Sequence, residues 1–154
     1  MFPNIYQDYI ARDVFLDQFL QISYSQNGED DFIREFFWTD ILERRVGVYL
    51  DIGCYDDCIA SNTKLLNLVG WKGIAVDADP DLIKPWLDSR PKDIFLNRCL
   101  CTSGQQASHV DFYRFEEYSQ NSTVNKRYAE DLIRQGVKLR DKISVVSTDL
   151  TKLA

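Results

Sequence analysis

The sequence contains no uninterrupted apolar segment long enough to act as a secretory signal or to span a membrane. Its opening segment is broken by charged residues at Asp8, Arg12, Asp13 and Asp17. Basic residues are also few: 18 Lys and Arg stand against 24 Asp and Glu, which gives a formal net charge of −6. Because an acidic chain repels the phosphate backbone, nucleic acid is not an expected partner. We therefore expect a soluble cytoplasmic protein that binds neither nucleic acids nor membranes.

Cysteine and histidine are scarce, with four cysteines and a single histidine. Because no secretory signal precedes Cys54, Cys58, Cys99 and Cys101, free thiols are favoured over disulfides. A zinc site made of all four thiolates is the alternative, although neither pair has the C-x2-C spacing of common zinc knuckles. His109 lies in a polar stretch, where a solvated side chain is favoured over a general base. The sequence thus predicts no metal, and it leaves the catalytic residues unknown.

Internal repeats, low-complexity tracts and linkers are absent as well, so the 154 residues indicate a single core. Apolar residues spaced by three and four predict an amphipathic helix in residues 5–20 and a second helix in residues 29–45. We therefore divide the chain into an N-terminal helical extension, residues 1–45, and an α/β domain, residues 46–154, on which the extension packs.

Short β-rich runs alternate with helical segments in the first part of this domain. Strands are predicted for residues 46–53, 74–77 and 94–97, and helices begin at residues 61 and 79. This alternation indicates a parallel sheet flanked by helices. Residues 90–93 have the composition of a turn. Later, an antiparallel strand is predicted around residues 110–115, a short polar helix at 125–135 and a last strand at 143–146.

The first two predicted strands end in polar residues that suit a nucleoside ligand. Gly53 follows the first strand and allows close approach of a ligand, while Asp77 ends the second strand and can accept hydrogen bonds from two ribose hydroxyls. Only the first glycine of a dinucleotide fingerprint is present. Asp56 and Asp57, which we expect to be solvated, would also repel a pyrophosphate. A cationic sulfonium tolerates these carboxylates better, which favours S-adenosylmethionine over a nicotinamide dinucleotide.

Several motifs occur in an order and spacing that resemble the FkbM-type methyltransferases, from about residue 24 to the C-terminus. The segments that carry the resemblance are Tyr24–Asp30, Tyr49–Gly53, Ser61–Thr63, Gly70–Ile74, Asp77, Arg90–Asp93, Ser122–Thr123 and Thr148–Leu150. The resemblance implies a Rossmann-like S-adenosylmethionine-dependent methyltransferase fold. It also implies methyl transfer from S-adenosyl-L-methionine to a hydroxyl of a sugar or another small metabolite.

The resemblance further assigns cofactor-binding roles, residue by residue. Asp51 and Gly53 match the first cofactor motif, and Asp77 matches the acid that binds the ribose. The other matched positions are Gln26 and Glu29, expected at the methionyl end; Asn62 and Thr63, expected to hold the methionyl carboxylate at a helix N-terminus; and Asn97, Cys99 and Leu100, expected beside the adenine.

The sequence departs from the family pattern in two places. The loop Cys54–Cys58 lacks the later glycines of the general methyltransferase motif. The fourth strand of the family should begin just after Leu150, so we expect an incomplete sheet whose catalytic residues lie elsewhere. An exposed sheet edge would favour a homodimer. Two alternatives therefore stay open: a nicotinamide-binding oxidoreductase, and a non-catalytic half-domain that acts as an interaction module.

Overall fold

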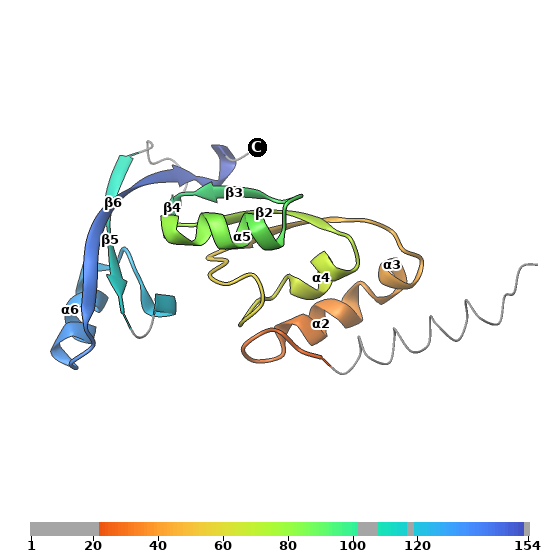
Figure 1. Ribbon diagram of the computed structural model, residues 1–154, viewed down its shortest axis with the longest axis horizontal. Coiled ribbons are helices and arrows are strands. Elements are labelled where there is room, and N and C mark those ends of the chain that lie inside the picture. The colour runs from red at the N-terminus through yellow and green to blue at the C-terminus, as the bar shows by residue number, and fades with distance from the viewer. Residues whose placement is uncertain (1–21, 102–107, 117–118, 153–154) are drawn as a thin grey trace, which may run out of the picture.

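A three-stranded parallel sheet forms the centre of the larger of two lobes (Figure 1). The computed structural model describes residues 22–101, 108–116 and 119–152, and the structural statements below concern those residues. The sheet consists of β1 (Val48–Ile52), β2 (Lys72–Asp77) and β3 (Ile94–Asn97), in the order β1-β2-β3. In register, Leu50 lies beside Ile74 and Ile74 beside Ile94. The parallel sheet predicted from the alternation of strands and helices is thus confirmed.

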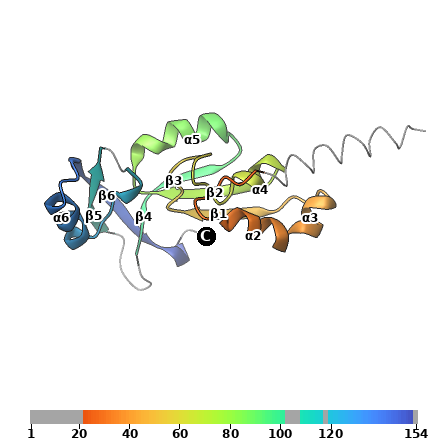
Figure 2. The same ribbon diagram turned by 90° about the horizontal axis from the view of Figure 1, so that it is seen from below.

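The helices of this lobe all lie on one side of the sheet. They are α2 (Glu29–Phe36), α3 (Trp38–Leu42), α4 (Lys64–Leu68), the 3-10 turn η1 (Pro80–Leu82) and α5 (Ile83–Ser89). Seen from the helical side, α5 lies toward β3, and α2 and α3 lie toward β1 (Figure 2). The helix predicted for residues 5–20 lies outside the described residues. Within them, no helix is long and apolar enough to cross a membrane.

The face of the sheet beneath these helices is closely packed. Ala75 is fully buried and packs with Trp86, which is 1% exposed and meets the ring of Phe95 edge to face. Tyr49 crosses directly over Gly73, where a β-carbon would lie only 1.8 Å from the ring. A glycine is therefore required at this position, because any side chain would collide with the tyrosine.

Much of the opposite face of the same sheet is apolar and exposed, although Val76, which lies beside Ile52 on this face, is 1% exposed. The side chains of Val48, Leu50, Ile52 and Ile94 are 76%, 46%, 52% and 57% exposed. They alternate along the strands with residues of the covered face, as the two-residue period of a strand requires. We call these four residues the bare face.

A second lobe is built on two long strands. Its sheet has the order β4-β6-β5, from β4 (Cys99–Cys101), β5 (Ser108–Phe115) and β6 (Leu139–Asp149). β4 continues the line of β3 after one residue, so a single stretch of chain serves both sheets. β5 runs antiparallel to β6, as the sequence predicts.

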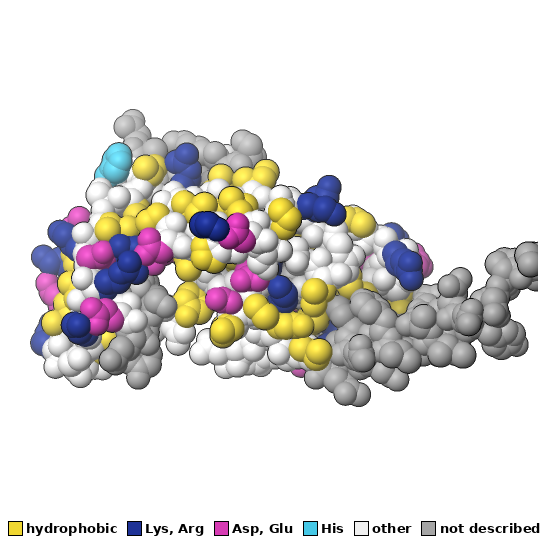
Figure 3. Space-filling view, in the orientation of Figure 1, with side chains coloured by type: hydrophobic (Ala, Val, Ile, Leu, Met, Phe, Trp, Pro, Cys, Tyr) yellow, Lys and Arg dark blue, Asp and Glu magenta, His cyan; other side chains and the backbone are white. Residues whose placement is uncertain are grey.

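Three short elements complete this lobe: η2 (Ser119–Asn121), α6 (Lys126–Arg134) and η3 (Leu150–Lys152). The predicted polar helix is α6, and its Ala129 and Leu132 pack against Phe115 of β5. Acidic and basic side chains are mixed over this lobe on the left of Figure 3, whereas hydrophobic side chains gather over β2 and β3 of the larger lobe at the top centre.

Some predicted boundaries are wrong. The single helix expected over residues 29–45 is divided at Phe37, whose backbone leaves helical geometry at φ −97° and ψ 17°. Its ring packs edge to face on Trp71, with centroids 5.1 Å apart, so the packing against Trp71 accompanies the break. The first strand begins at Val48 rather than at residue 46, and the last one extends well beyond residues 143–146 because β5 pairs with it along its length.

Candidate functional site

A cavity of about 330 Å³ lies at the carboxyl ends of β1 and β2, where the two lobes meet. Its apolar lining includes Ile52, Val76, Leu82 and Phe112. Its polar lining comes from two groups: Gly53, Tyr55, Asp77 and Asp79 of the larger lobe, and Arg98, Gln120, Ser122 and Thr123 at or beyond the junction. The volume falls in the range of small-molecule sites, roughly 300–1,000 Å³. Ligands of open parallel sheets bind at this end of the strands.

Gly53 lets the backbone border the cavity directly. Its N–H donates to the carbonyl of Val76 at 2.8 Å, which ties the end of β1 to β2. The residue has φ +70°, a conformation that glycine adopts without strain, and a β-carbon there would meet no atom within 4 Å. The space beside Gly53 is therefore open to a ligand.

Asp77 is the carboxylate at the end of β2, and it faces the same cavity. One of its oxygens accepts the N–H of Tyr55 at 3.1 Å, and the other accepts the N–H of Asp79 at 2.9 Å. Burial raises the pKa of Asp77, and these N–H groups partly oppose the rise. Since a carboxylate has about four acceptor sites, each oxygen can still accept a hydrogen bond from a ligand.

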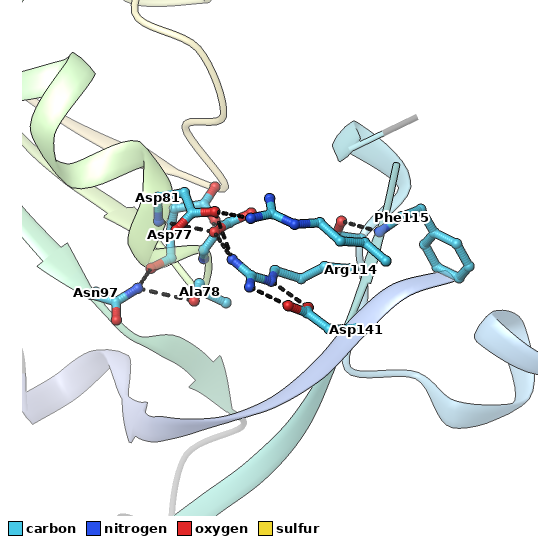
Figure 4. A network of polar contacts seen from close by, with 10 residues as sticks. Asp77, Ala78, Asp81, Asn97, Arg114, Phe115 and Asp141 are labelled. Carbon is cyan, nitrogen blue, oxygen red and sulfur yellow. Dashed lines mark hydrogen bonds and ion pairs between the residues drawn. The ribbon is translucent and has the colours of Figure 1, made fainter. Parts of the chain in front are cut away.

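Asn97 supports Asp77 from the adjacent strand without lining the cavity. Its side-chain amide donates to the carbonyls of Asp77 at 3.0 Å and Ala78 at 2.9 Å (Figure 4). The next residue adds a backbone bond, from the N–H of Arg98 to the carbonyl of Asp77 at 2.9 Å. The position of Asp77 is thus fixed by its neighbours on both sides.

An arginine from the second lobe connects the two lobes behind the cavity. Arg114 donates to Asp79 and to Asp81 at 3.0 Å, and it forms a two-pronged contact with Asp141 at 2.6 and 2.7 Å (Figure 4). Arg140 adds an ion pair to Asp81 at 2.7 Å. Hydrogen bonds, first of all to Asp141, raise the pKa of Arg114. Local sequence patterns give no indication of this network, because Arg114 lies 27 to 35 residues from its partners in the chain.

Asp51 and Thr63 are brought together, but away from the cavity lining. The Thr63 hydroxyl donates to the Asp51 carboxylate and in turn accepts from Arg90 at 2.9 Å. Burial raises the pKa of Asp51, and the Thr63 hydroxyl opposes the rise. The helix expected at Ser61 begins at Lys64, and the Thr63 side chain does not cap it; its hydroxyl bonds Asp51 and Arg90 instead.

Residues 90–93 form the expected turn, closed by the N–H of Asp93 donating to the carbonyl of Arg90 at 3.0 Å, and they also hold a buried polar cluster. Arg90 is 1% exposed and lies over the ring of Trp86, 4.2 Å from its centroid. Asp93 accepts from the Tyr49 hydroxyl at 2.6 Å, from the N–H of Gly73 at 2.8 Å and from the Trp86 indole at 3.3 Å. Burial and the Asp93 hydrogen bond raise the pKa of Tyr49 to about 12. Nothing in the sequence indicates that Arg90 and Asp93 are buried, since charged residues normally remain at the surface.

The polar motif ahead of β1 supports the fold through Asp30 rather than through the residues we singled out. Asp30 is fully buried and accepts from the hydroxyls of Ser23 and Ser25 and from the N–H of Tyr24, each at 2.6 Å. Desolvation opposes ionisation of this carboxyl, but the hydrogen bonds outweigh it and lower its pKa. The carbonyl of Tyr24 then accepts the N–H of Ser61 at 3.0 Å, which joins the motif to the loop before α4.

Gln26, Glu29 and Asn62 are exposed, and none of them lines the cavity. Glu29 accepts from the backbone and side-chain N–H groups of Asn27, both at 2.9 Å, and these bonds lower its pKa to about 2. Of the predicted cofactor contacts, Gly53, Asp77, Cys99 and Leu100 do line the cavity. The cofactor-binding roles assigned to all ten residues stay predictions.

The loop after β1 uses its own N–H groups internally. The Asp56 carboxylate accepts from the N–H groups of Cys58 at 2.8 Å and of Ile59 at 2.7 Å. The Asp57 carboxylate bonds Lys64 at 3.3 Å. The expectation that both acids are merely solvated is therefore wrong, because they cap and brace the loop.

The cysteines and His109 contribute no metal site. All four cysteines are free, and the described residues contain no group of three or more His, Cys, Asp or Glu side chains that could hold a metal ion. Burial raises the pKa of the Cys54 thiol, which packs beneath the sheet, whereas Cys99 lines the cavity. His109 is exposed on β5 and does not line the cavity.

Comparison of the whole chain with known protein families, with characterised proteins and with solved structures gave no match.

Proposed function

We propose that this chain binds S-adenosylmethionine in the cavity at the ends of β1 and β2 and transfers its methyl group to a hydroxyl of a sugar or another small metabolite. In this proposal the parallel sheet β1-β2-β3 belongs to a Rossmann-like methyltransferase fold, as in the FkbM-type enzymes that the sequence resembles. The observation that carries the proposal is that Asp77 faces the cavity beside Gly53, with acceptor capacity remaining on both carboxylate oxygens.

Different residues of the cavity would bind different parts of this cofactor. Asp77 would accept the two ribose hydroxyls, and Gly53 would let the cofactor approach the backbone. Cys99 and Leu100, at the start of β4, would border the adenine. When bound, S-adenosylmethionine would supply a methyl group carried on a cationic sulfur. The negative charge of Asp77 would favour that cation over an anionic ligand at the same place.

The loop after β1 supports S-adenosylmethionine over a nicotinamide dinucleotide. A pyrophosphate is normally held by free N–H groups of a glycine-rich loop and of the helix that follows it directly. In this chain Asp56 occupies the N–H groups of Cys58 and Ile59, and α4 begins only at Lys64. The carboxylates of Asp56 and Asp57 would also repel a pyrophosphate.

The bare face supports a second candidate function, that of an interaction module. Its four aliphatic side chains form an exposed apolar patch on a sheet whose other face is packed, and such patches mark interaction sites. Because the outer edge of β1 borders this patch, self-association through this edge of the sheet would cover both.

Calorimetric titration of the chain with S-adenosylhomocysteine tests the first proposal. We expect saturable binding by the wild type, weakened about tenfold or more in Asp77→Ala, because the variant loses hydrogen bonds to a charged acceptor. Asp111→Ala is the matched control, since Asp111 is an exposed carboxylate on β5 that pairs with Lys142 outside the cavity.

Circular dichroism must show that each variant is folded, and Asp77→Asn serves as a second, more conservative change. No binding to a folded wild-type chain would contradict the proposal. Saturable binding of NADH instead, lost in Asp77→Ala, would favour the oxidoreductase.

A further inference from the structure

Among the described residues that line the cavity, Arg98 is the only Lys or Arg. It lies between the end of β3 and the start of β4, and its backbone N–H is bonded to the carbonyl of Asp77. Its exposed side chain forms no ion pair with any other described residue. A guanidinium at the wall of a cavity, without a carboxylate partner there, is available to a ligand.

Two hydroxyls on the far side of the lobe junction add hydrogen-bond donors to the same cavity. The Ser122 oxygen accepts the N–H of Phe115 at 3.3 Å, and the Thr123 oxygen accepts the N–H of Asn125 at 3.0 Å. Since each oxygen already accepts a bond, its own hydrogen can be donated to a ligand. Backbone bonds between Thr123 and Tyr113, at 2.9 and 3.0 Å, hold this segment against β5.

Only some of the charged side chains that line the cavity have a partner of opposite charge. Asp79 is neutralised by Arg114 at 3.0 Å. Among the described residues, Asp77 and Arg98 line the cavity without an oppositely charged side chain as partner. A pair of ligands that brought a cation near Asp77 and an anion near Arg98 would therefore complement both charges.

We infer that the methyl acceptor is an anionic small metabolite, and that Arg98 binds its carboxylate or phosphate together with the Ser122 and Thr123 hydroxyls. This inference rests on the proposed function, in which the cofactor occupies the Asp77 side of the cavity. Arginine matches the planar geometry of an oxyanion with two parallel hydrogen bonds, whereas a neutral sugar gives it no such partner. Arg98 thereby selects acidic acceptors over neutral ones.

The test is an NMR titration of the chain saturated with S-adenosylhomocysteine. Three probes of similar size are added in separate experiments: glycerol 3-phosphate, glycerate and neutral glycerol. We expect one or both anions to bind and to shift the Arg98 side-chain resonance, while glycerol does not. Arg98→Gln should weaken anion binding about tenfold or more, the loss of a charged hydrogen-bond donor pair. Arg127→Gln, which changes an exposed arginine on α6 outside the cavity, should leave it unchanged.

Each outcome separates this inference from the proposed function. Equal binding of glycerol and the anions, no anion binding, or anion binding that survives Arg98→Gln would overturn the inference while S-adenosylhomocysteine still binds. An equal loss of S-adenosylhomocysteine and anion affinity in Arg98→Gln would also overturn it, because Arg98 would then hold the carboxylate of the cofactor. Failure of S-adenosylhomocysteine to bind the wild-type chain would instead overturn the proposed function itself, and this inference with it.

Discussion

The two faces of the parallel sheet are built from the same three strands, yet one is a finished core and the other is not. On the covered face, Trp86 is 1% exposed, and Tyr49 is 7% exposed above Gly73. On the bare face, Val48 is 76% exposed and Ile94 is 57% exposed. A sheet of parallel strands normally has apolar residues on both faces because both are covered. The strands of this chain follow that pattern, so the bare face has the composition of a surface that is meant to be covered.

The covered face also differs from the bare face because it buries charged side chains. Arg90 and Asp93 are buried beneath the helices, and each is bonded to several partners. Burial of charge is tolerated only where hydrogen bonds replace water. The covered face therefore tolerates few substitutions, whereas the bare face should tolerate many as far as stability is concerned.

The largest expected effect is the loss of a covered-face side chain. Trp86→Ala should lower the free energy of unfolding by about 3–5 kcal/mol, because it leaves a large cavity among Ala75, Phe95 and Arg90. Ile94→Ala on the bare face should cost no more than about 1 kcal/mol, since more than half of that side chain is already exposed. Urea denaturation followed by circular dichroism measures both. Equal losses in the two variants would show that the bare face is in fact covered.

A smaller loss of stability is expected when the buried carboxylate of Asp30, at the start of α2, is replaced. Asp30→Asn should destabilise the fold by about 1–3 kcal/mol at pH 7, because three donors lose a charged acceptor. The pKa of Asp30 is lowered in the folded state, so its contribution is fully present above the unfolded pKa of about 4 and is lost as the pH falls through the lower folded value.

The difference in stability between wild type and Asp30→Asn should therefore narrow below about pH 4. Urea denaturation at a series of pH values measures it. Asp31→Asn is the neighbouring control, an exposed residue for which we expect a change of less than about 1 kcal/mol. A difference for Asp30→Asn that is constant from pH 7 to pH 3 would argue against a lowered pKa at this site.

A substitution on the bare face should have the smallest effect on stability and a clear effect on self-association. Leu50→Lys should change the free energy of unfolding by less than about 1 kcal/mol, because Leu50 is 46% exposed. It should suppress a self-association that the wild type shows as concentration rises, since a charge in the apolar patch opposes contact between two copies. Light scattering over a range of concentrations measures the mass.

Ile59→Lys is the matched control for this experiment, because Ile59 is 70% exposed in the loop before α4, away from the sheet. It should associate as the wild type does. A wild-type chain that stays monomeric at every concentration would remove the support for self-association through the bare face.

Much of the fold was predictable because it depends on local patterns. The β3 strand, the α6 helix and the antiparallel strand around residues 110–115 follow directly from apolar periodicity and from turn residues. The division of the helix at Phe37 was not predictable, because the break accompanies packing on Trp71, a residue distant in sequence. Likewise, the composition of residues 90–93 gave no sign that Arg90 is buried.

The candidate site was predictable only in part, for a similar reason. Gly53 and Asp77 could be placed together, because the ends of adjacent parallel strands meet at one edge of a sheet. Asp51 and Thr63 were expected to contact the cofactor, yet they bond each other, and Thr63 also accepts a hydrogen bond from Arg90. Arg98 was overlooked between two predicted adenine contacts. No short-range pattern indicates that it shares a cavity with Ser122 and Thr123 from the second lobe.

The sequence by itself determined where most strands and helices form and which strand ends carry a glycine and a carboxylate, because these features depend on residues close together in the chain. Only the tertiary structure decided which charges are buried in pairs, which face of the sheet is left bare and which side chains share the cavity. These depend on contacts between segments tens of residues apart, such as Arg114 with Asp79, and such contacts leave no periodic signal in the sequence.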